Sequence, residues 1–168
     1  MENFIKLMAA FGIGFVIVLL VMPKVIPFLH KMKFGQVERE EGLESHKKKG
    51  GTPTMGGVVF VLAAVIAAFV VNYKNIANPN LILITIVLVG YSLIGFVDDA
   101  LIILKHQNEG LKAWQKFLMQ AILAVGCYLY LENFVPGFTT EVTIPVVKVN
   151  IDFGWFYAIL VFIMFTGE

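Results

Sequence analysis

Five long apolar segments divide this chain and leave little of it for a water-soluble fold. They occupy residues 4–22, 55–72, 81–104, 117–131 and 153–168. A helix needs about 20 residues to cross a hydrocarbon core of about 30 Å. Apolar residues make up 58% of the 168 positions, which exceeds the share that a soluble domain carries. The sequence therefore predicts a single all-α polytopic membrane domain with about five transmembrane helices.

Basic residues are concentrated in two of the connections between these segments. Connections 24–49 and 105–116 together hold ten of the 13 lysines and arginines. Cytoplasmic loops of membrane proteins are rich in Lys and Arg, so we expect both connections on the cytoplasmic side. The N-terminus is then outside and Glu168 inside, as an odd number of spans requires.

The connection between the fourth and fifth segments has a different pattern. Residues 138–152 read FTTEVTIPVVKVNID, and this alternation predicts a short external β-hairpin that turns near residues 144–146. We expect it to lie flat on the membrane interface, with an irregular connector as the alternative. The single cysteine, Cys127, lies in an apolar run and excludes a disulfide framework.

Two adjacent carboxylates, Asp98 and Asp99, lie near the end of the third segment. Acidic residues inside membrane spans are costly, rare and usually functional. At 1.5 Å per residue, Asp98 is about 26 Å along a helix that begins at Leu81, at the cytoplasmic mouth of the bilayer. Successive helical residues point about 100° apart, so one acid can face a substrate while the other faces a cation or a lysine. Lys105 shares the face of Asp98, and a solvated helix-end pair without function is the alternative.

The first basic connection ends in HKKKGGTPTMGG, residues 46–57. Its glycines let backbone amides approach an anion, and Thr52 and Thr54 offer hydroxyl donors. A helix that begins near Met55 adds its N-terminal amides. The pattern favours a phosphate site, although a basic anchor followed by a turn also explains the lysines.

The second basic connection leads into the fourth segment through NEGLKAWQKFLMQ, residues 108–120. Asn108 and Gly110 predict a turn that opens a helix. Lys112 and Lys116 could meet lipid phosphates at the membrane surface. Alone, this stretch is typical of an amphipathic entry to a span.

Together these elements closely resemble one bacterial family, the phospho-MurNAc-pentapeptide translocases (MraY). The family pattern includes FGQ-x-x-R-x-x-G, H-x-x-K-x-GTPTMGG and DD-x-x-K-x-x-x-x-x-N-x-GL. This chain matches the pattern in order and spacing, except that Ile102 replaces the lysine after the aspartates. The matching positions are Phe34, Gly35, Gln36, Arg39, Gly42, His46, Lys49, Gly51–Gly57, Asp98, Asp99, Asn108, Gly110 and Leu111.

The resemblance implies a reaction at the cytoplasmic face of the bacterial inner membrane. Phospho-MurNAc-pentapeptide would pass from UDP-MurNAc-pentapeptide to undecaprenyl phosphate, giving lipid I and UMP for peptidoglycan synthesis, with Mg²⁺ as cofactor. Asp98 and Asp99 match the family's catalytic aspartates, and either could also be a metal ligand. The implied substrate-binding residues are His46, Lys49, Gly51, Thr52, Thr54, Lys105, Asn108 and Lys116.

The resemblance also implies partners and leaves alternatives open. Family members are longer, so this chain corresponds to an N-terminal portion, completed by a C-terminal half that carries the main metal ligand. We expect a homodimer surrounded by membrane lipids, and we expect no nucleic acid among its partners. The alternatives are a polyprenyl-phosphate GlcNAc-1-phosphate transferase, a small proton or cation transporter subunit that uses Asp98 and Asp99, and a non-catalytic remnant.

Overall fold

The computed structural model describes residues 1–31, 55–105, 110–144 and 149–167. Within these ranges the chain is mostly helical, with one small antiparallel sheet. The elements are α1 (Glu2–Lys31), α3 (Gly57–Val71), the 3₁₀ turn η1 (Tyr73–Asn75), α4 (Pro79–Lys105), α5 (Ala113–Phe134), β1 (Glu141–Ile144), β2 (Val149–Asp152) and α6 (Phe156–Thr166). The prediction of an all-α membrane protein with a short hairpin is confirmed.

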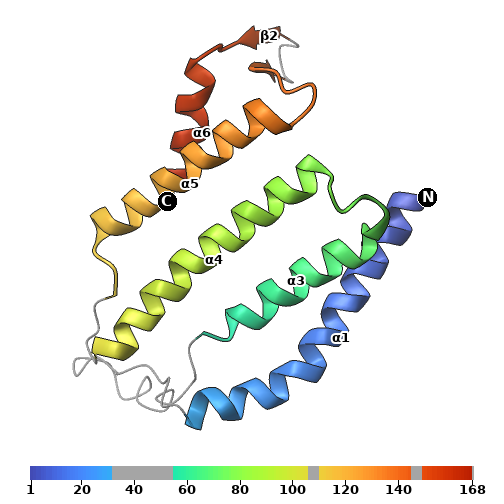
Figure 1. The fold of residues 1–168 in the computed structure, drawn as a ribbon, viewed down its shortest axis with the longest axis vertical. Coiled ribbons are helices and arrows are strands. Elements are labelled where there is room, and N and C mark those ends of the chain that lie inside the picture. The colour runs from blue at the N-terminus through green and yellow to red at the C-terminus, as the bar shows by residue number, and fades with distance from the viewer. Residues whose placement is uncertain (32–54, 106–109, 145–148, 168) are drawn as a thin grey trace.

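The helices form a row in which each packs on the next along the chain. Contacts join α1 to α3, α3 to α4, α4 to α5, and α5 to α6. Figure 1 shows α1, α4 and α6 running one way along this layer and α3 and α5 the other. The end of α4 and the beginnings of α3 and α5 therefore lie at one end of the layer, and the hairpin lies at the opposite end.

The most deeply buried side chains between the helices are small, while many large apolar side chains face outward. Ala63, Ala67, Ala124 and Cys127 are each no more than 3% exposed. Small residues let helix backbones approach closely in a membrane, where the hydrophobic effect does not drive helices together. Side chains such as Ile122, which is 65% exposed, are then suited to contact with lipid.

Each predicted apolar segment overlaps one of the five α-helices that the described residues form. In the part of the chain that the structure describes, three helices are long and apolar enough to cross a membrane, namely Phe4–His30 within α1, then α4 and α5. The helices α3 and α6 are apolar but shorter, with 15 and 11 residues. That these two also span the bilayer stays a prediction.

Helix α1 extends beyond the predicted end of the first segment at residue 22. It continues to Lys31 and includes Pro23 and Pro27. Proline removes a backbone donor and bends a helix, and Figure 1 shows α1 bent. Its last turns still pack, since Leu29 is only 7% exposed, and this packing maintains the helix where the sequence suggested a loop.

A hydrogen bond links α4 to α6 across the row. The hydroxyl of Tyr91 donates to the backbone oxygen of Phe165, and the two rings lie 5.9 Å apart.

The neighbouring Gly90 allows the close approach of α5, because a Cβ there would lie 2.6 Å from a terminal methyl of Leu123.

We expect Tyr91→Phe to lower the free energy of unfolding by about 0.5–1 kcal/mol, the usual size of a hydrogen bond between membrane helices. The ring contact with Phe165 remains, so the loss reports the hydroxyl alone. Unfolding by SDS in mixed micelles measures the change. Tyr128→Phe is a matched control, since the Tyr128 ring packs against Phe138 and its hydroxyl has no hydrogen-bond partner among the described residues. An equal loss in both variants would contradict this role of Tyr91.

Candidate functional site

Asp98 joins the end of α4 to the beginning of α5. Its Oδ1 accepts a hydrogen bond of 2.6 Å from the backbone N–H of Leu111. Its Oδ2 lies 2.7 Å from Nζ of Lys116, which forms an ion pair with it. The side chain of Asp98 is 21% exposed and that of Lys116 is 43% exposed. Because charge-assisted hydrogen bonds are short and strong, Asp98 fixes the position at which α5 begins.

Gly110 makes this arrangement possible. A Cβ at position 110 would lie 2.2 Å from Oδ1 of Asp98 and 2.9 Å from its backbone oxygen. The turn can therefore pass this close to Asp98 only with glycine at that position. In the next turn, the backbone N–H of Lys112 donates to Oε1 of Gln115 at 2.9 Å, which satisfies an N-terminal amide of α5. The Asp98, Gly110 and Leu111 positions of the sequence pattern thus form one contact.

Asp99 contacts a different neighbour. Its carboxylate accepts a hydrogen bond from the backbone N–H of Met55, just before α3. Met55 has a φ of 69°, a left-handed conformation that is uncommon for a residue with a side chain. Such a backbone is retained where surrounding contacts hold it, and Asp99 supplies one of these contacts. The two acids therefore diverge, as the helical geometry predicts.

The structure brings together three of the predicted site residues, Asp98, Asp99 and Lys116. Lys105 lies in the last turn of α4 and is exposed. The cation that pairs with Asp98 is Lys116 of the neighbouring helix, rather than the Lys105 that shares its helix face. The other predicted site residues lie outside the described residues; they are His46, Lys49, Gly51, Thr52, Thr54 and Asn108.

Two contributors to this site were missed by sequence reasoning. The backbone amides of Met55 and Leu111 bind the acids, and no side-chain pattern identifies a backbone donor. Leu111 does belong to the matched N-x-GL motif, so the sequence carries a signal, but that motif does not indicate which group the backbone of Leu111 binds.

A metal ion would need ligands beyond the described side chains. Among those residues, no group of three or more His, Cys, Asp and Glu could hold one. Both oxygens of Asp98 are engaged. A carboxylate accepts several hydrogen bonds, so Asp99 can take a further partner besides Met55. Mg²⁺ usually binds one or two carboxylates together with water and substrate phosphates, and Asp99 fits that role.

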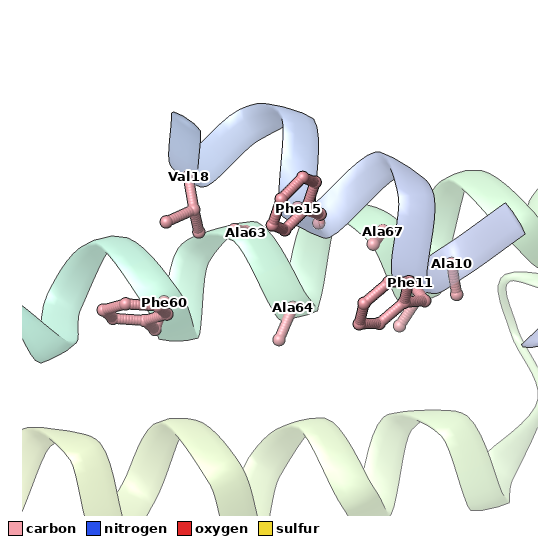
Figure 2. Close-up of a pocket in the computed structure, with 10 residues that line it drawn as sticks. Ala10, Phe11, Phe15, Val18, Phe60, Ala63, Ala64 and Ala67 are labelled. Atoms are coloured by element: carbon pink, nitrogen blue, oxygen red, sulfur yellow. The ribbon is translucent and has the colours of Figure 1, made fainter. Parts of the chain in front are cut away.

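Two apolar grooves run along α1 and α3. One has a volume of about 490 Å³, with Phe11 and Phe15 from α1 facing Phe60 and alanines of α3, and Figure 2 shows these side chains. The other, of about 560 Å³, extends to Met55 and includes Phe96 of α4. The second groove therefore places apolar surface beside the residue that binds Asp99.

The fold and this site define a polytopic membrane protein in which one helix end presents two acids to the beginnings of two neighbouring helices. Residues 49–61 match the family description "Phospho-N-acetylmuramoyl-pentapeptide-transferase signature 1". Proteins named phospho-N-acetylmuramoyl-pentapeptide-transferase match most of the chain. The one from Halalkalibacterium halodurans is 43% identical over 156 residues, covering 92% of this chain and 47% of the relative. The one from Bacillus subtilis is 42% identical over 155 residues, with the same two coverages.

The relative from Staphylococcus epidermidis is 43% identical over 155 residues, covering 91% of this chain and 47% of its own length. Over most of its length the chain is thus similar to proteins named phospho-N-acetylmuramoyl-pentapeptide-transferase, which confirms the resemblance seen in its motifs. It spans about half the length of the curated relatives that it matches.

Proposed function

We propose that this chain is part of an enzyme that transfers phospho-MurNAc-pentapeptide from UDP-MurNAc-pentapeptide to undecaprenyl phosphate, releasing UMP and forming lipid I. The observation that carries the proposal is the convergence of Asp98, Asp99 and Lys116 at one end of the helical layer. There, Met55 ties Asp99 to the segment that bears the transferase signature. We place this end at the cytoplasmic face of the bacterial inner membrane, since the basic connections adjoin it.

In this proposal, a phosphate oxygen of the lipid attacks the phosphorus that carries the sugar, and the electron pair of the broken P–O bond leaves with UMP. Asp98 orients the lipid phosphate or takes its proton. Lys116 binds a phosphate oxygen of the lipid. When its ammonium group moves from Asp98 to that oxygen, Oδ2 of Asp98 is free to accept the proton. Such transfers depend chiefly on positioning and on charges that stabilise the transition state.

Asp99 would hold Mg²⁺ together with ligands from outside the described residues. When bound, Mg²⁺ supplies positive charge that neutralises the phosphate oxygens. Lys49, with its neighbours Thr52 and Thr54, would bind the nucleotide diphosphate, and His46, Gly51, Lys105 and Asn108 complete the proposed substrate-binding set.

The apolar groove that reaches Met55 is suited to the hydrocarbon chain of the lipid substrate. A polyprenyl chain lying there would bring its phosphate toward Asp99 and Lys116. The proposal further includes a C-terminal half, corresponding to the remaining length of the relatives, and a homodimer embedded in membrane lipids.

The test is lipid I synthesis in proteoliposomes. This chain, co-expressed with the remaining half of a relative, should convert labelled UDP-MurNAc-pentapeptide and undecaprenyl phosphate to lipid I and UMP when Mg²⁺ is present. The chain alone should give no turnover. Use of UDP-GlcNAc in place of the pentapeptide nucleotide would indicate the GlcNAc-1-phosphate transferase instead. Proton or cation flux without lipid I would contradict the transferase proposal and favour a transporter subunit.

A further inference from the structure

The β1–β2 hairpin has one polar face and one apolar face. Its strands pair Glu141 with Asp152, Val142 with Ile151, and Thr143 with Asn150. Directly paired residues share a face, and successive residues alternate between faces. The polar face carries Glu141, Thr143, Asn150 and Asp152, and the apolar face carries Val142, Val149 and Ile151.

Hydrogen bonds organise the polar face. The hydroxyl of Thr143 donates to Oδ1 of Asn150 at 2.9 Å. Asp152 accepts hydrogen bonds from the Thr140 hydroxyl and from the backbone N–H of Gly154. These two hydrogen bonds, of which the one from Thr140 has the larger effect, hold the pKa of the Asp152 carboxyl below its usual value. The polar face is therefore charged at neutral pH and suited to water.

The apolar face is exposed in the chain. Val149 is 47% exposed and Ile151 is 40% exposed. Shortly after β2, Trp155 and Phe156 are 69% and 52% exposed, with their rings stacked 3.9 Å apart. A two-stranded hairpin is marginally stable alone in water, so this surface needs a covering.

The position of the hairpin indicates what covers it. It connects α5 to α6, and Figure 1 shows it beyond the ends of both helices. Phe138, just before the hairpin, packs edge-on against Tyr128 of α5 and Tyr157 of α6. These contacts hold the base of the hairpin close to the end of α5 and the beginning of α6. Trp and Tyr gather at this level of a membrane, between the acyl chains and the water.

We propose that the hairpin is an interfacial anchor: its Val149 and Ile151 face, continued by Trp155 and Phe156, lies in the headgroup region of the bilayer that α5 and α6 enter. The polar face with Asn150 then points to water. The anchor fixes the depth of α6, the shortest of the described α-helices. It does not depend on transferase activity.

Adjacent positions on β2 provide the test. Cys127 is the only cysteine, so a Cys127→Ala background accepts a single spin label at Ile151→Cys or, as its matched control, at Asn150→Cys. The chain is reconstituted in phospholipid vesicles, and label collisions are measured with oxygen, which concentrates in lipid, and with an aqueous nickel chelate. The label at position 151 should collide more often with oxygen than with the nickel chelate. The label at position 150 should collide more often with the nickel chelate.

Two results would overturn the proposal. Equal access of nickel to both labels would place the whole hairpin in water. Protection of the 151 label from both reagents would mean that protein covers this face, either a second copy or another segment.

A second readout avoids labels within the strand. Trp114→Phe leaves Trp155 as the only tryptophan, and its fluorescence should be quenched by lipids brominated near the headgroup and little by aqueous iodide. Quenching by iodide alone would also refute the anchor.

Discussion

Replacing Asp98 by asparagine is expected to reduce lipid I synthesis by the completed enzyme at least about 100-fold, the lower end of the usual contribution from a positioned acid–base group. The asparagine oxygen can still accept the hydrogen bond from Leu111, so the turn before α5 is retained. The amide cannot take a proton from the lipid phosphate, and it loses the ion pair with Lys116. The measurement is kcat and KM for both substrates in nanodiscs.

A double variant separates chemistry from positioning. In Asp98→Asn with Lys116→Gln, two neutral amides can hydrogen-bond where the ion pair was. If Asp98 and Lys116 only position α5, this pair should recover much of the activity of the completed enzyme. If either side chain acts on the substrate, thermal stability should recover while turnover stays low. Full turnover by Asp98→Asn alone would remove Asp98 from the mechanism.

Substitution of Gly110 by alanine is expected to destabilise the chain by about 2–4 kcal/mol, the combined cost of overpacking and of a lost hydrogen bond to a charged group. The new Cβ would lie 2.2 Å from Oδ1 of Asp98, so either the turn or the carboxylate must move. The Leu111 hydrogen bond is then broken. Unfolding by SDS in mixed micelles measures the loss.

Gly95→Ala in α4 is the control for Gly110→Ala. A Cβ at Gly95 meets no atom within 4 Å, and alanine favours a helix over glycine by about 0.5–1 kcal/mol. Gly95→Ala should therefore be neutral or slightly stabilising. Equal behaviour of the two variants would show that the approach of Gly110 to Asp98 has no energetic importance.

The positions of the helices and the divergence of the acids could be predicted from the sequence. Apolar segments of sufficient length define membrane helices because lipid requires every backbone group to be bonded within the element. The 100° step of a helix separates Asp98 from Asp99 whatever surrounds them. Both inferences depend only on local geometry.

The partner of Asp98 could not be predicted in this way. Lys105 shares its helix face, but two turns of helix separate them by about 10 Å. Lys116 lies further along the chain, yet its Nζ is 2.7 Å from Oδ2 of Asp98. The chain can turn back this closely because Gly110 has no Cβ to meet Asp98. Contacts between helices depend on the conformation of the turn that joins them. The sequence shows a short polar connection here but does not show its conformation. The same limit applies to α1, where packing of Leu29 accompanies a helix that continues beyond the predicted end of the first segment at residue 22.

Consecutive residues of α4 contact the starts of two different helices, α5 through Asp98 and α3 through Asp99. Because neighbouring side chains on one helical turn move together, the backbone at Met55 and the backbone at Leu111 are coupled through this turn of α4. A displacement of the start of α3 would therefore be transmitted to the start of α5 without a rearrangement of the other helices.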